Sequence, residues 1–259
     1  METIKQASDL LRACRSQGAD IPNLPDTMRP ASHAEAYAIQ QQVETPADPR
    51  KGWKIAATST AGQQHIGVSG PIIGRITSGM MLAEGAPVSA ASNRMLVAEA
   101  EFVFVFNKTI TPRPQRYSQQ EALSLVSALR LGLEFPNSRY THFETAGELS
   151  LIADNACAHQ FMLGPAVPDS WRELMLAEHV VTGQVAGTHK YEGVGANVLG
   201  DPRKALLWFL NETAAQNITI DEDDFVTTGT STQPMPFQAG DTISADFGIL
   251  GEMRCQISD

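Results

Sequence analysis

The sequence predicts an α+β fold with a small helical N-terminal region and a β-rich body that carries helices on its outside. Two observations support this prediction. Apolar residues recur at helical spacing in the first part of the chain, whereas from Lys51 onward short runs of β-branched and aromatic residues alternate with glycine and proline. The segment "TPADPR" at 45–50 separates the two patterns. We therefore expect a helical region over 1–48 and a β-rich domain over 49–259.

Four helices are expected along the chain. The first covers 4–16, where apolar residues recur every three or four positions. The second begins after Ser32, the third is expected over 118–130 and the fourth over 201–216, and each of these three starts with a helix-capping signal. The signals are Ser32 with Glu35, Ser118 with Glu121, and Asp201 with Pro202.

Strands are expected wherever β-branched and aromatic residues lie between turn residues. The predicted strands lie near 52–58, 96–106, 130–135, 151–154, 158–163, 177–185, 224–228 and 242–247. The segment "FGILGEMRCQIS" at 247–258 is expected to form a closing hairpin. We find no internal repeat, heptad pattern or low-complexity tract.

Composition and charge are those of a globular protein of 259 residues, with 42% hydrophobic and 19% charged residues. A net charge of −10 argues against nucleic acid or an anionic membrane as partner. The first residues, "METIKQASDL", have no apolar signal core, and no run is long enough to span a bilayer. Cys14, Cys157 and Cys255 are far apart, so we expect reduced, buried thiols and a cytoplasmic location.

The strand "MLVAEAEFVFVF" carries two glutamates on one face. Side chains alternate across a strand, so Glu99 and Glu101 point the same way and lie roughly 6–7 Å apart. At an effective dielectric constant near 20, two ionised carboxylates at that distance repel each other by ~2–3 kcal/mol. Their face continues with Val103 and Val105, and the opposite face is apolar as well. That opposite face consists of Ala98, Ala100, Phe102, Phe104 and Phe106.

Two explanations account for this pair of carboxylates. Glu99 and Glu101 face solvent from an edge strand, as glutamates commonly do, or they are buried and need a cation or a shared proton. Apolar residues on both faces favour a buried strand. Ligands that are all oxygen would select a hard ion, which means Mg²⁺, Mn²⁺ or Ca²⁺ rather than zinc.

Together with Glu134 in "LGLEFPNSRY", Glu99 and Glu101 resemble the three-carboxylate metal site of the 2-keto-4-pentenoate hydratase family. That family includes the 4-oxalocrotonate decarboxylases and belongs to the fumarylacetoacetate hydrolase superfamily. Four further segments resemble family segments in the expected order, so the resemblance runs from about Ala31 to the end of the chain. They are "GWKIAATSTAGQQHIGV", "IADNACAHQFMLG", "GANVLGDPRKALLWFLN" and "TTGTSTQPMPFQAGDTISADFG".

The resemblance implies a fold of mixed strands curled into a barrel-like body, of the fumarylacetoacetate hydrolase C-terminal type, with the metal in its mouth. It implies that Glu99, Glu101 and Glu134 bind Mg²⁺ or Mn²⁺, which chelates the carboxylate and 2-oxygen of a 2-hydroxydienoate or 2-oxo acid. Family members are oligomeric, and hydratases and decarboxylases of the family associate. We therefore expect a homo-oligomer, with association with a related enzyme as a further option.

Three residues are candidates for catalysis. Lys54 lies in the otherwise apolar "GWKIAAT", where burial near a cation would lower its pKa and allow proton transfer. The alternative is a lysine that snorkels from a strand edge. Ser138 and Arg139 stand where the family has a similar Asp-Ser-Arg. Arg139 would neutralise the carboxylates, bind a distal substrate carboxylate, or form a structural ion pair.

Substrate contacts are expected after the strand that carries Lys54. Thr58 and Ser59 follow Lys54 and would hydrogen-bond substrate oxygens or merely close a turn. Gln63 and His65 lie in the next loop, where a lid-like role competes with a surface position.

Two later segments add further candidates. Gly229 and Thr230 resemble the family's late substrate loop, whose backbone N–H groups can bind a carboxylate. Asp154 and Asn155 would orient the metal's waters or the nearby backbone.

The sequence departs from the family pattern at three places. Ile72 stands where many members carry an acid, Asn137 replaces the Asp of Asp-Ser-Arg after an unusual Pro136, and Ala56 replaces a glycine. An acid near the lysine is a natural partner for activating water. Ile72 therefore weakens the expectation of ordinary pentenoate hydration.

We expect a metal-dependent lyase of aromatic catabolism, a hydratase that acts on a 2-hydroxy-2,4-dienoate or unsaturated 2-oxo acid through a metal-bound enolate. The alternatives are a 4-oxalocrotonate-type decarboxylase, an acylpyruvate C–C hydrolase, and a non-catalytic paralogue that binds a 2-oxo acid. Other motifs are missing: the sequence has no strand-GxGxxG-helix context, no GxSxG and no Walker lysine.

Overall fold

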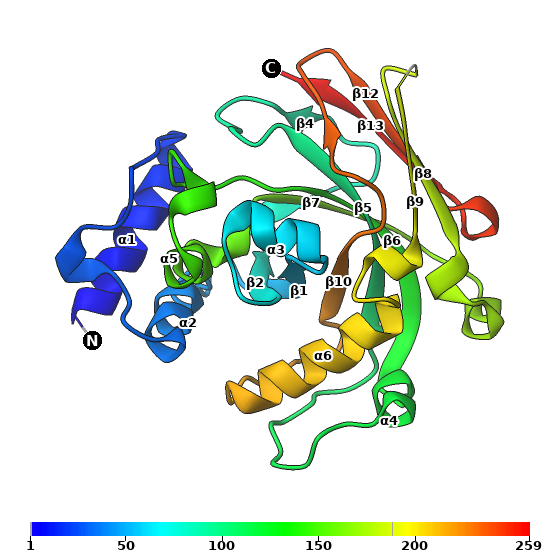
Figure 1. The fold of residues 1–259 in the computed structure, drawn as a ribbon, viewed down its shortest axis with the longest axis horizontal. Helices are drawn as coiled ribbons and strands as arrows, with labels where there is room; N and C mark the ends of the chain where they lie inside the picture. Colours follow the sequence, from blue (N-terminus) through cyan, green and yellow to red (C-terminus); the bar gives the residue numbers. More distant parts are fainter. Residues whose placement is uncertain (1, 188) are drawn as a thin grey trace.

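The computed structural model describes residues 2–187 and 189–259, and two β-sheets form the body of this part of the chain (Figure 1). The larger sheet has eight strands in the order β2-β1-β10-β5-β6-β7-β3, with β11 paired to β5. The smaller sheet has five strands in the order β4-β13-β12-β8-β9. The larger sheet contains β1 Arg50–Ala56, β2 Ile72–Thr77, β3 Met81–Leu82, β5 Val97–Phe106, β6 Val126–Phe135, β7 Gln160–Ala166, β10 Phe225–Thr230 and β11 Met235–Pro236. The smaller sheet contains β4 Val88–Ser89, β8 Val180–Val185, β9 His189–Val194, β12 Thr242–Asp246 and β13 Glu252–Ser258.

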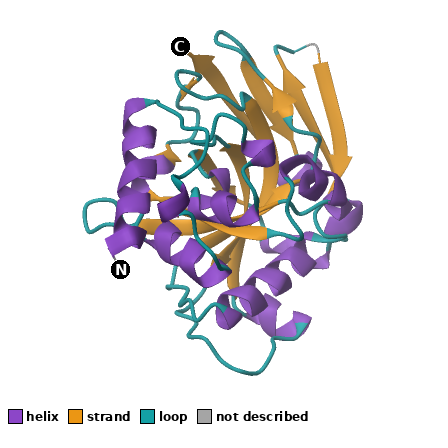
Figure 2. Ribbon diagram, turned by 60° about the vertical axis from the view of Figure 1, so that its left-hand side comes forward, coloured by secondary structure: helices purple, strands orange, loops and turns teal. Residues whose placement is uncertain are grey.

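Helices lie outside the sheets, as Figure 2 shows with helices in purple around strands in orange. The α-helices are α1 Glu2–Gln17, α2 His33–Gln41, α3 Thr60–Ile66, α4 Gln119–Ser124, α5 Glu148–Ala153 and α6 Pro202–Ala215. The short 3₁₀ turns are η1 Asp26–Met28, η2 Ser78–Met80, η3 Phe143–Thr145, η4 Asn155–Cys157, η5 Asp169–Glu173, η6 Leu176–Glu178, η7 Gly195–Asn197 and η8 Gly248–Leu250. No helix in the described ranges is both long and apolar enough to cross a membrane.

The capping signals predict three helix starts correctly. Ser32 accepts a hydrogen bond from the Glu35 N–H at the start of α2, and Ser118 forms the full capping box of α4. Asp201 accepts from the Arg203 N–H at 2.7 Å and begins α6. The helix predicted over 4–16 is α1, and the closing hairpin is the antiparallel pair of β12 and β13.

Several predicted elements differ from the structure. The helix expected over 118–130 ends at Ser124, and the residues from Val126 onward form β6. Pairing with β5 buries Leu129, Leu131 and Leu133 of β6. The free energy gained by this burial outweighs the helix propensity of the segment. The strand expected at 151–154 lies largely in α5, because a short apolar run fits a buried helix as well as a strand. Strands β2 and β9 and helix α3 were not predicted.

The two faces of the larger sheet pack into separate clusters. Phe102 and Phe104 of β5 belong to the large hydrophobic core, which also takes in Ala7 of α1. Val103 points the other way, into a small cluster with Phe161 and Phe225, whose stacked ring centroids lie 5.3 Å apart. The division of the chain at residue 48 remains a prediction.

Candidate metal centre

Three glutamates converge on the face of the sheet that carries the small cluster. Glu99 and Glu101 lie on β5, and Glu134 lies on β6 directly opposite Glu99. One carboxylate oxygen from each residue lies within 4.8 Å of the others. Glu101 and Glu134 are 0% and 1% exposed, whereas Glu99 is partly exposed. The structure therefore favours the buried explanation over a solvent-facing edge strand.

The two buried carboxylates, Glu101 and Glu134, lack enough partners for buried negative charges. Glu101 Oε2 accepts from the Gly229 N–H at 2.8 Å, but Glu101 Oε1 and both Glu134 oxygens have no hydrogen-bond partner among the described residues. Lys54 Nζ lies 3.0 Å from Glu134 Oε1 and forms an ion pair with it. The angles at these two atoms do not meet the geometry of a hydrogen bond. Buried carboxylate oxygens without partners are the ligands that a hard divalent cation takes.

The electrostatics of the centre support the same conclusion. Burial, followed by the charge of Glu134, raises the pKa of Glu99 to about 7. Burial and the charges of Glu134 and Glu99 raise the pKa of Glu101 well above its usual range. Both shifts mean that this arrangement disfavours the charged forms and that further positive charge would stabilise them. The three residues fit a divalent ion.

Lys54 lies in β1 between β2 and β10, where it pairs with Gly74 on one side and Thr227 on the other. It is 3% exposed, which excludes the snorkelling alternative. Its Nζ donates to the Ala156 carbonyl oxygen at 3.0 Å. Burial lowers the pKa of Lys54, but Glu134 and Glu99 outweigh burial, and the pKa lies above its ordinary value. The lowering was expected for a lysine beside a bound cation, so it stays a prediction for the metal-bound protein.

The loop after β1 meets the end of β10. Gly229 has φ +95°, and a Cβ on it would lie 2.2 Å from Thr58 Oγ1, so this position requires glycine. Its N–H binds Glu101, a candidate metal ligand, in this structure. Thr230 Oγ1 donates to the Thr232 carbonyl oxygen at 3.0 Å. Thr58 and Gly229 thus lie beside the centre, and their contact with substrate stays a prediction.

The segment predicted as a lid-like loop forms helix α3. Ser59 Oγ accepts from the Gly62 N–H at 3.0 Å, so Ser59 caps the helix, as the turn-closing alternative expects. Gln63 Nε2 donates to the Ala57 carbonyl oxygen at 3.1 Å. The His65 ring packs against Phe143 with centroids 5.8 Å apart. These contacts hold α3 in place, and substrate contact by Gln63 or His65 remains a prediction.

Ser138 and Arg139 both bind Asp154. Ser138 Oγ donates to Asp154 Oδ2 at 2.7 Å, and Arg139 donates from its backbone N–H and from Nε to the same carboxylate. The remaining Arg139 nitrogens donate to backbone carbonyl oxygens of Ala158 and Asp154. Arg139 is 2% exposed. This geometry favours the structural ion pair over the two site roles considered for Arg139.

Comparison with known proteins identifies the family of the chain. Residues 33–258 match the fumarylacetoacetate (FAA) hydrolase C-terminal family. The chain belongs to this family. It is 27% identical to a 2-keto-4-pentenoate hydratase from Burkholderia vietnamiensis over 253 residues, covering 96% of this chain and 95% of the relative. It is 26% identical to a 4-oxalocrotonate decarboxylase from a Pseudomonas species, covering 88% and 86% of the two chains.

Two solved structures of a 4-oxalocrotonate decarboxylase superpose on nearly the whole chain. A 4-oxalocrotonate decarboxylase from Pseudomonas putida, complexed with magnesium and adipate, has a TM-score of 0.89 at 23% identity, covering 99% of this chain and 97% of that one. The predicted family and the barrel-like fold type are confirmed.

Two features of this FAA hydrolase family member concern residues around the lysine. Ile72 begins β2, pairs with Ala56 and is 3% exposed in the large core, so an apolar residue suits its place here.

The role of Ala156 was missed in the sequence, although its carbonyl oxygen contacts Lys54. The available signal was the preceding Asn155, since asparagine is the residue most tolerant of left-handed backbone after glycine.

Proposed function

We propose that the chain is a metal-dependent lyase that hydrates an unsaturated 2-oxo acid or its 2-hydroxy-2,4-dienoate form. One observation carries this proposal: three buried or half-buried carboxylates converge with unpartnered oxygens beside the buried Lys54. The names of the relatives support it, since they include hydratases and decarboxylases. The chain is accordingly an enzyme, with decarboxylation as the second candidate reaction.

Mg²⁺ or Mn²⁺ is the proposed cofactor. Glu99, Glu101 and Glu134 would hold it, and a bound divalent ion of this kind supplies Lewis-acid polarisation of a carbonyl group. Two related decarboxylase structures, one complexed with magnesium and adipate and one with calcium and acetate, support a divalent ion at such a centre.

Lys54 is the proposed proton carrier. Its Nζ is held by Glu134 on one side and by the Ala156 carbonyl oxygen on the other, so the ammonium is fixed next to the carboxylates. Neutralisation of the carboxylates would remove the charge that raises the pKa of Lys54 and leave burial as the dominant influence. Burial lowers a lysine pKa toward the range in which proton transfer is effective.

The contacts of Arg139 bear on whether the substrate carries one carboxylate or two. 4-Oxalocrotonate carries a second carboxylate, and Arg139 was the cation that the sequence offered for it. Because its donors go to Asp154 and backbone oxygens, Arg139 supports a substrate with one carboxylate. An acylpyruvate C–C hydrolase and a non-catalytic 2-oxo-acid-binding paralogue remain as further alternatives.

A turnover assay with three substrates tests the proposal. We expect Mg²⁺-dependent loss of the dienol absorbance of 2-hydroxypenta-2,4-dienoate, with Glu101→Gln as the inactive control. CO₂ release from 4-oxalocrotonate as the main reaction would favour the decarboxylase. Cleavage of an acylpyruvate would favour the hydrolase, and no turnover of any substrate would favour the paralogue.

We further propose that the protein is a cytoplasmic homo-oligomer. Met175, Val180 and Ile249 are 65%, 58% and 79% exposed. They belong to the chain segments around His179 and Phe247, which meet where His179 Nε2 contacts the Phe247 carbonyl oxygen. A second copy would cover such exposed apolar side chains. The three free, buried cysteines support a reducing compartment. Light scattering of the purified chain would give its subunit number, and Ile249→Ser should reduce it. A monomer that forms a larger species only with a related hydratase or decarboxylase would favour association with a related enzyme.

A further inference from the structure

The turn after α5 has an uncommon backbone. Asn155, Ala156 and Cys157 have φ values of 59°, 50° and 60°, so three consecutive residues with side chains lie in the left-handed region. This region suits asparagine better than alanine or cysteine, which experience steric strain there. Strained backbone persists only where surrounding contacts enforce it, and it clusters at functional sites. Contacts around this turn must therefore hold it in the left-handed conformation.

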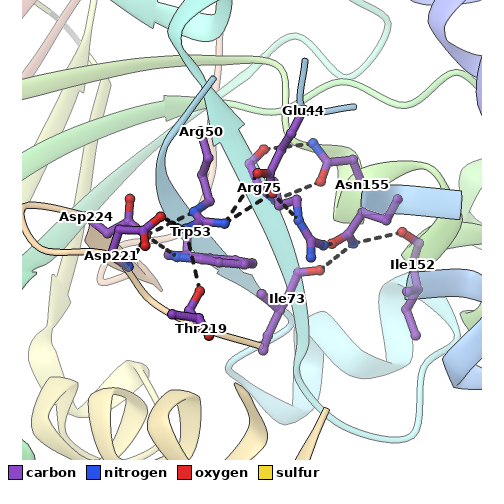
Figure 3. A network of polar contacts seen from close by, with 11 residues as sticks. Glu44, Arg50, Trp53, Ile73, Arg75, Ile152, Asn155, Thr219, Asp221 and Asp224 are labelled. Atoms are coloured by element: carbon purple, nitrogen blue, oxygen red, sulfur yellow. Dashed lines mark hydrogen bonds and ion pairs between the residues drawn. The ribbon is translucent and has the colours of Figure 1, made fainter. Parts of the chain in front are cut away.

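The Asn155 side chain attaches the turn to strand β2. Its Oδ1 accepts from the Arg75 N–H at 2.7 Å, and its Nδ2 donates to the Arg75 carbonyl oxygen at 2.8 Å. Figure 3 shows Asn155 beside Arg75. Since β2 is the last strand at this end of the larger sheet, the amide group takes the place of a neighbouring strand. Asn155 is 3% exposed, so water does not compete with this pair of bonds.

Two further contacts hold the turn from its other sides. The Cys157 carbonyl oxygen accepts from the Asn137 N–H at 2.9 Å, which links the turn to the segment after β6. On β2, a Cβ at Gly74 would lie 2.5 Å from the Asn155 carbonyl oxygen, so the missing side chain lets the turn approach the strand. The position of the turn is thus fixed by β2 and by the segment after Glu134.

The middle residue of the turn faces the lysine of the candidate centre. The Ala156 carbonyl oxygen accepts from Lys54 Nζ at 3.0 Å, and the same Nζ lies 3.0 Å from Glu134 Oε1. Two acceptors on different elements therefore define where the ammonium sits. The direction of the Ala156 carbonyl depends on the left-handed conformation, which Asn155 holds through Arg75.

We propose that Asn155 is a positioning residue for Lys54, because it holds the left-handed turn on β2 and so fixes the Ala156 carbonyl oxygen against Lys54 Nζ. Asn155 touches neither the glutamates nor the lysine ammonium through its own side chain, so it acts through the turn. The catalytic part of this inference rests on the proposed function, whereas the placement of Lys54 does not.

Asn155→Gly and Ala156→Gly form a matched pair for the test. Asn155→Gly keeps access to the left-handed region and removes both bonds to Arg75. Ala156→Gly relaxes the neighbouring residue and keeps both bonds and the carbonyl group. The first readout is the rate of reductive methylation of Lys54 in the metal-free protein, followed by mass spectrometry. Protection of the buried Cys14 thiol against a maleimide reports whether the rest of the fold stays closed.

We expect faster methylation of Lys54 in Asn155→Gly than in wild type and Ala156→Gly, with Cys14 equally protected in all three. In the hydration assay we expect kcat to fall by ~10²-fold in Asn155→Gly, the size of effect that a small misplacement of a catalytic group produces, with KM unchanged. Asn155→Asp keeps the size and one acceptor, so it replaces Asn155→Gly if the glycine variant exposes Cys14. Unchanged methylation in the variant that keeps Cys14 protected would overturn the proposal. Faster methylation with no turnover by wild type would instead count against the proposed function alone.

Discussion

Glu99 and Glu134 face each other directly across the antiparallel pair of β5 and β6. Residues directly opposite in such a pair have Cβ atoms about 4.5–5.5 Å apart, and like charges there destabilise the sheet. Glu101 adds a third carboxylate on the same face, while Lys54 supplies one positive charge. The metal-free centre therefore stores repulsion that an ion would relieve.

Glu101→Gln should weaken Mg²⁺ binding sharply and stabilise the metal-free protein. The amide keeps an oxygen for the Gly229 N–H and cannot ionise, so it avoids the repulsion and burial that raise the pKa of Glu101. We therefore expect a gain of about 1–2 kcal/mol in the free energy of unfolding without metal. Titration calorimetry gives the affinity, and urea unfolding in EDTA gives the stability. The exposed Glu252→Gln is the control, and unchanged Mg²⁺ affinity in Glu101→Gln would remove Glu101 from the ligand set.

The stability of the metal-free protein should fall as pH rises through about 7. The pKa of Glu99 is raised from 4.5 to about 7, so the folded state holds a proton that the unfolded state has released between these values. The stabilising contribution is complete below pH 4.5 and is lost as pH rises through about 7. Other groups titrate in this range, so the measurement is the difference in unfolding free energy between wild type and Glu99→Gln. A difference that does not change from pH 5 to pH 8 would contradict the shift.

His159 should make the protein less stable as pH falls below 6.5. Burial, followed by the charges of Arg15 and Arg139, lowers the pKa of His159 to about 3. The unfolded chain therefore takes up a proton from pH 6.5 downward while the folded chain does not, and the lost stability reaches on the order of 1 kcal/mol at pH 5.5. His159→Gln should flatten this part of the stability–pH curve. Equal slopes in the two proteins would show that His159 is protonated in the fold.

Arg139→Gln should destabilise the fold without changing the preference among substrates. Asp154 is 2% exposed, and removal of its cation leaves a buried charge, which costs about 3–5 kcal/mol. Inhibition constants for a monocarboxylic and a dicarboxylic 2-oxo acid should keep their ratio in folded variant protein. A selective loss of affinity for the diacid would show that Arg139 binds its second carboxylate.

Lys54→Met should abolish most proton exchange at carbon 3 of a small 2-oxo acid. Hydration and decarboxylation both require proton traffic next to the 2-oxo group, so this test does not depend on the choice between them. We expect wild type to exchange the C3 protons of 2-oxopentanoate with solvent in the presence of Mg²⁺ or Mn²⁺, and the variant to be slower by ~10²-fold or more. Proton NMR in D₂O follows the signal, and its persistence in wild type with metal would rule out enolate chemistry.

The alternation of side chains along the sequence predicted those parts of the site that lie within a single strand. The period of two along "VAEAEFVFVF" placed Glu99 and Glu101 on one face without further information. Glu134 could be added only through the resemblance, because it lies on another strand and strand register cannot be read from the chain. Strand β2 was missed because Gly74 and Arg75 interrupt its apolar residues.

Residues whose partners are distant in sequence were the least predictable. Arg139 follows Glu134 closely, yet β6 ends at Phe135 and the chain then turns so that Arg139 meets Asp154 instead of the carboxylates. One of the two partners of Lys54 is a backbone carbonyl, which has no signature in side-chain chemistry. Both contacts depend on the course of the backbone between elements.

The three carboxylates differ in exposure: Glu99 is partly open, while Glu101 and Glu134 are closed off beside the stacked Phe161 and Phe225 cluster. For a divalent ion held by these three residues, Glu99 would be the ligand in contact with water. Exchange of such an ion with solvent would therefore begin on the Glu99 side of the centre.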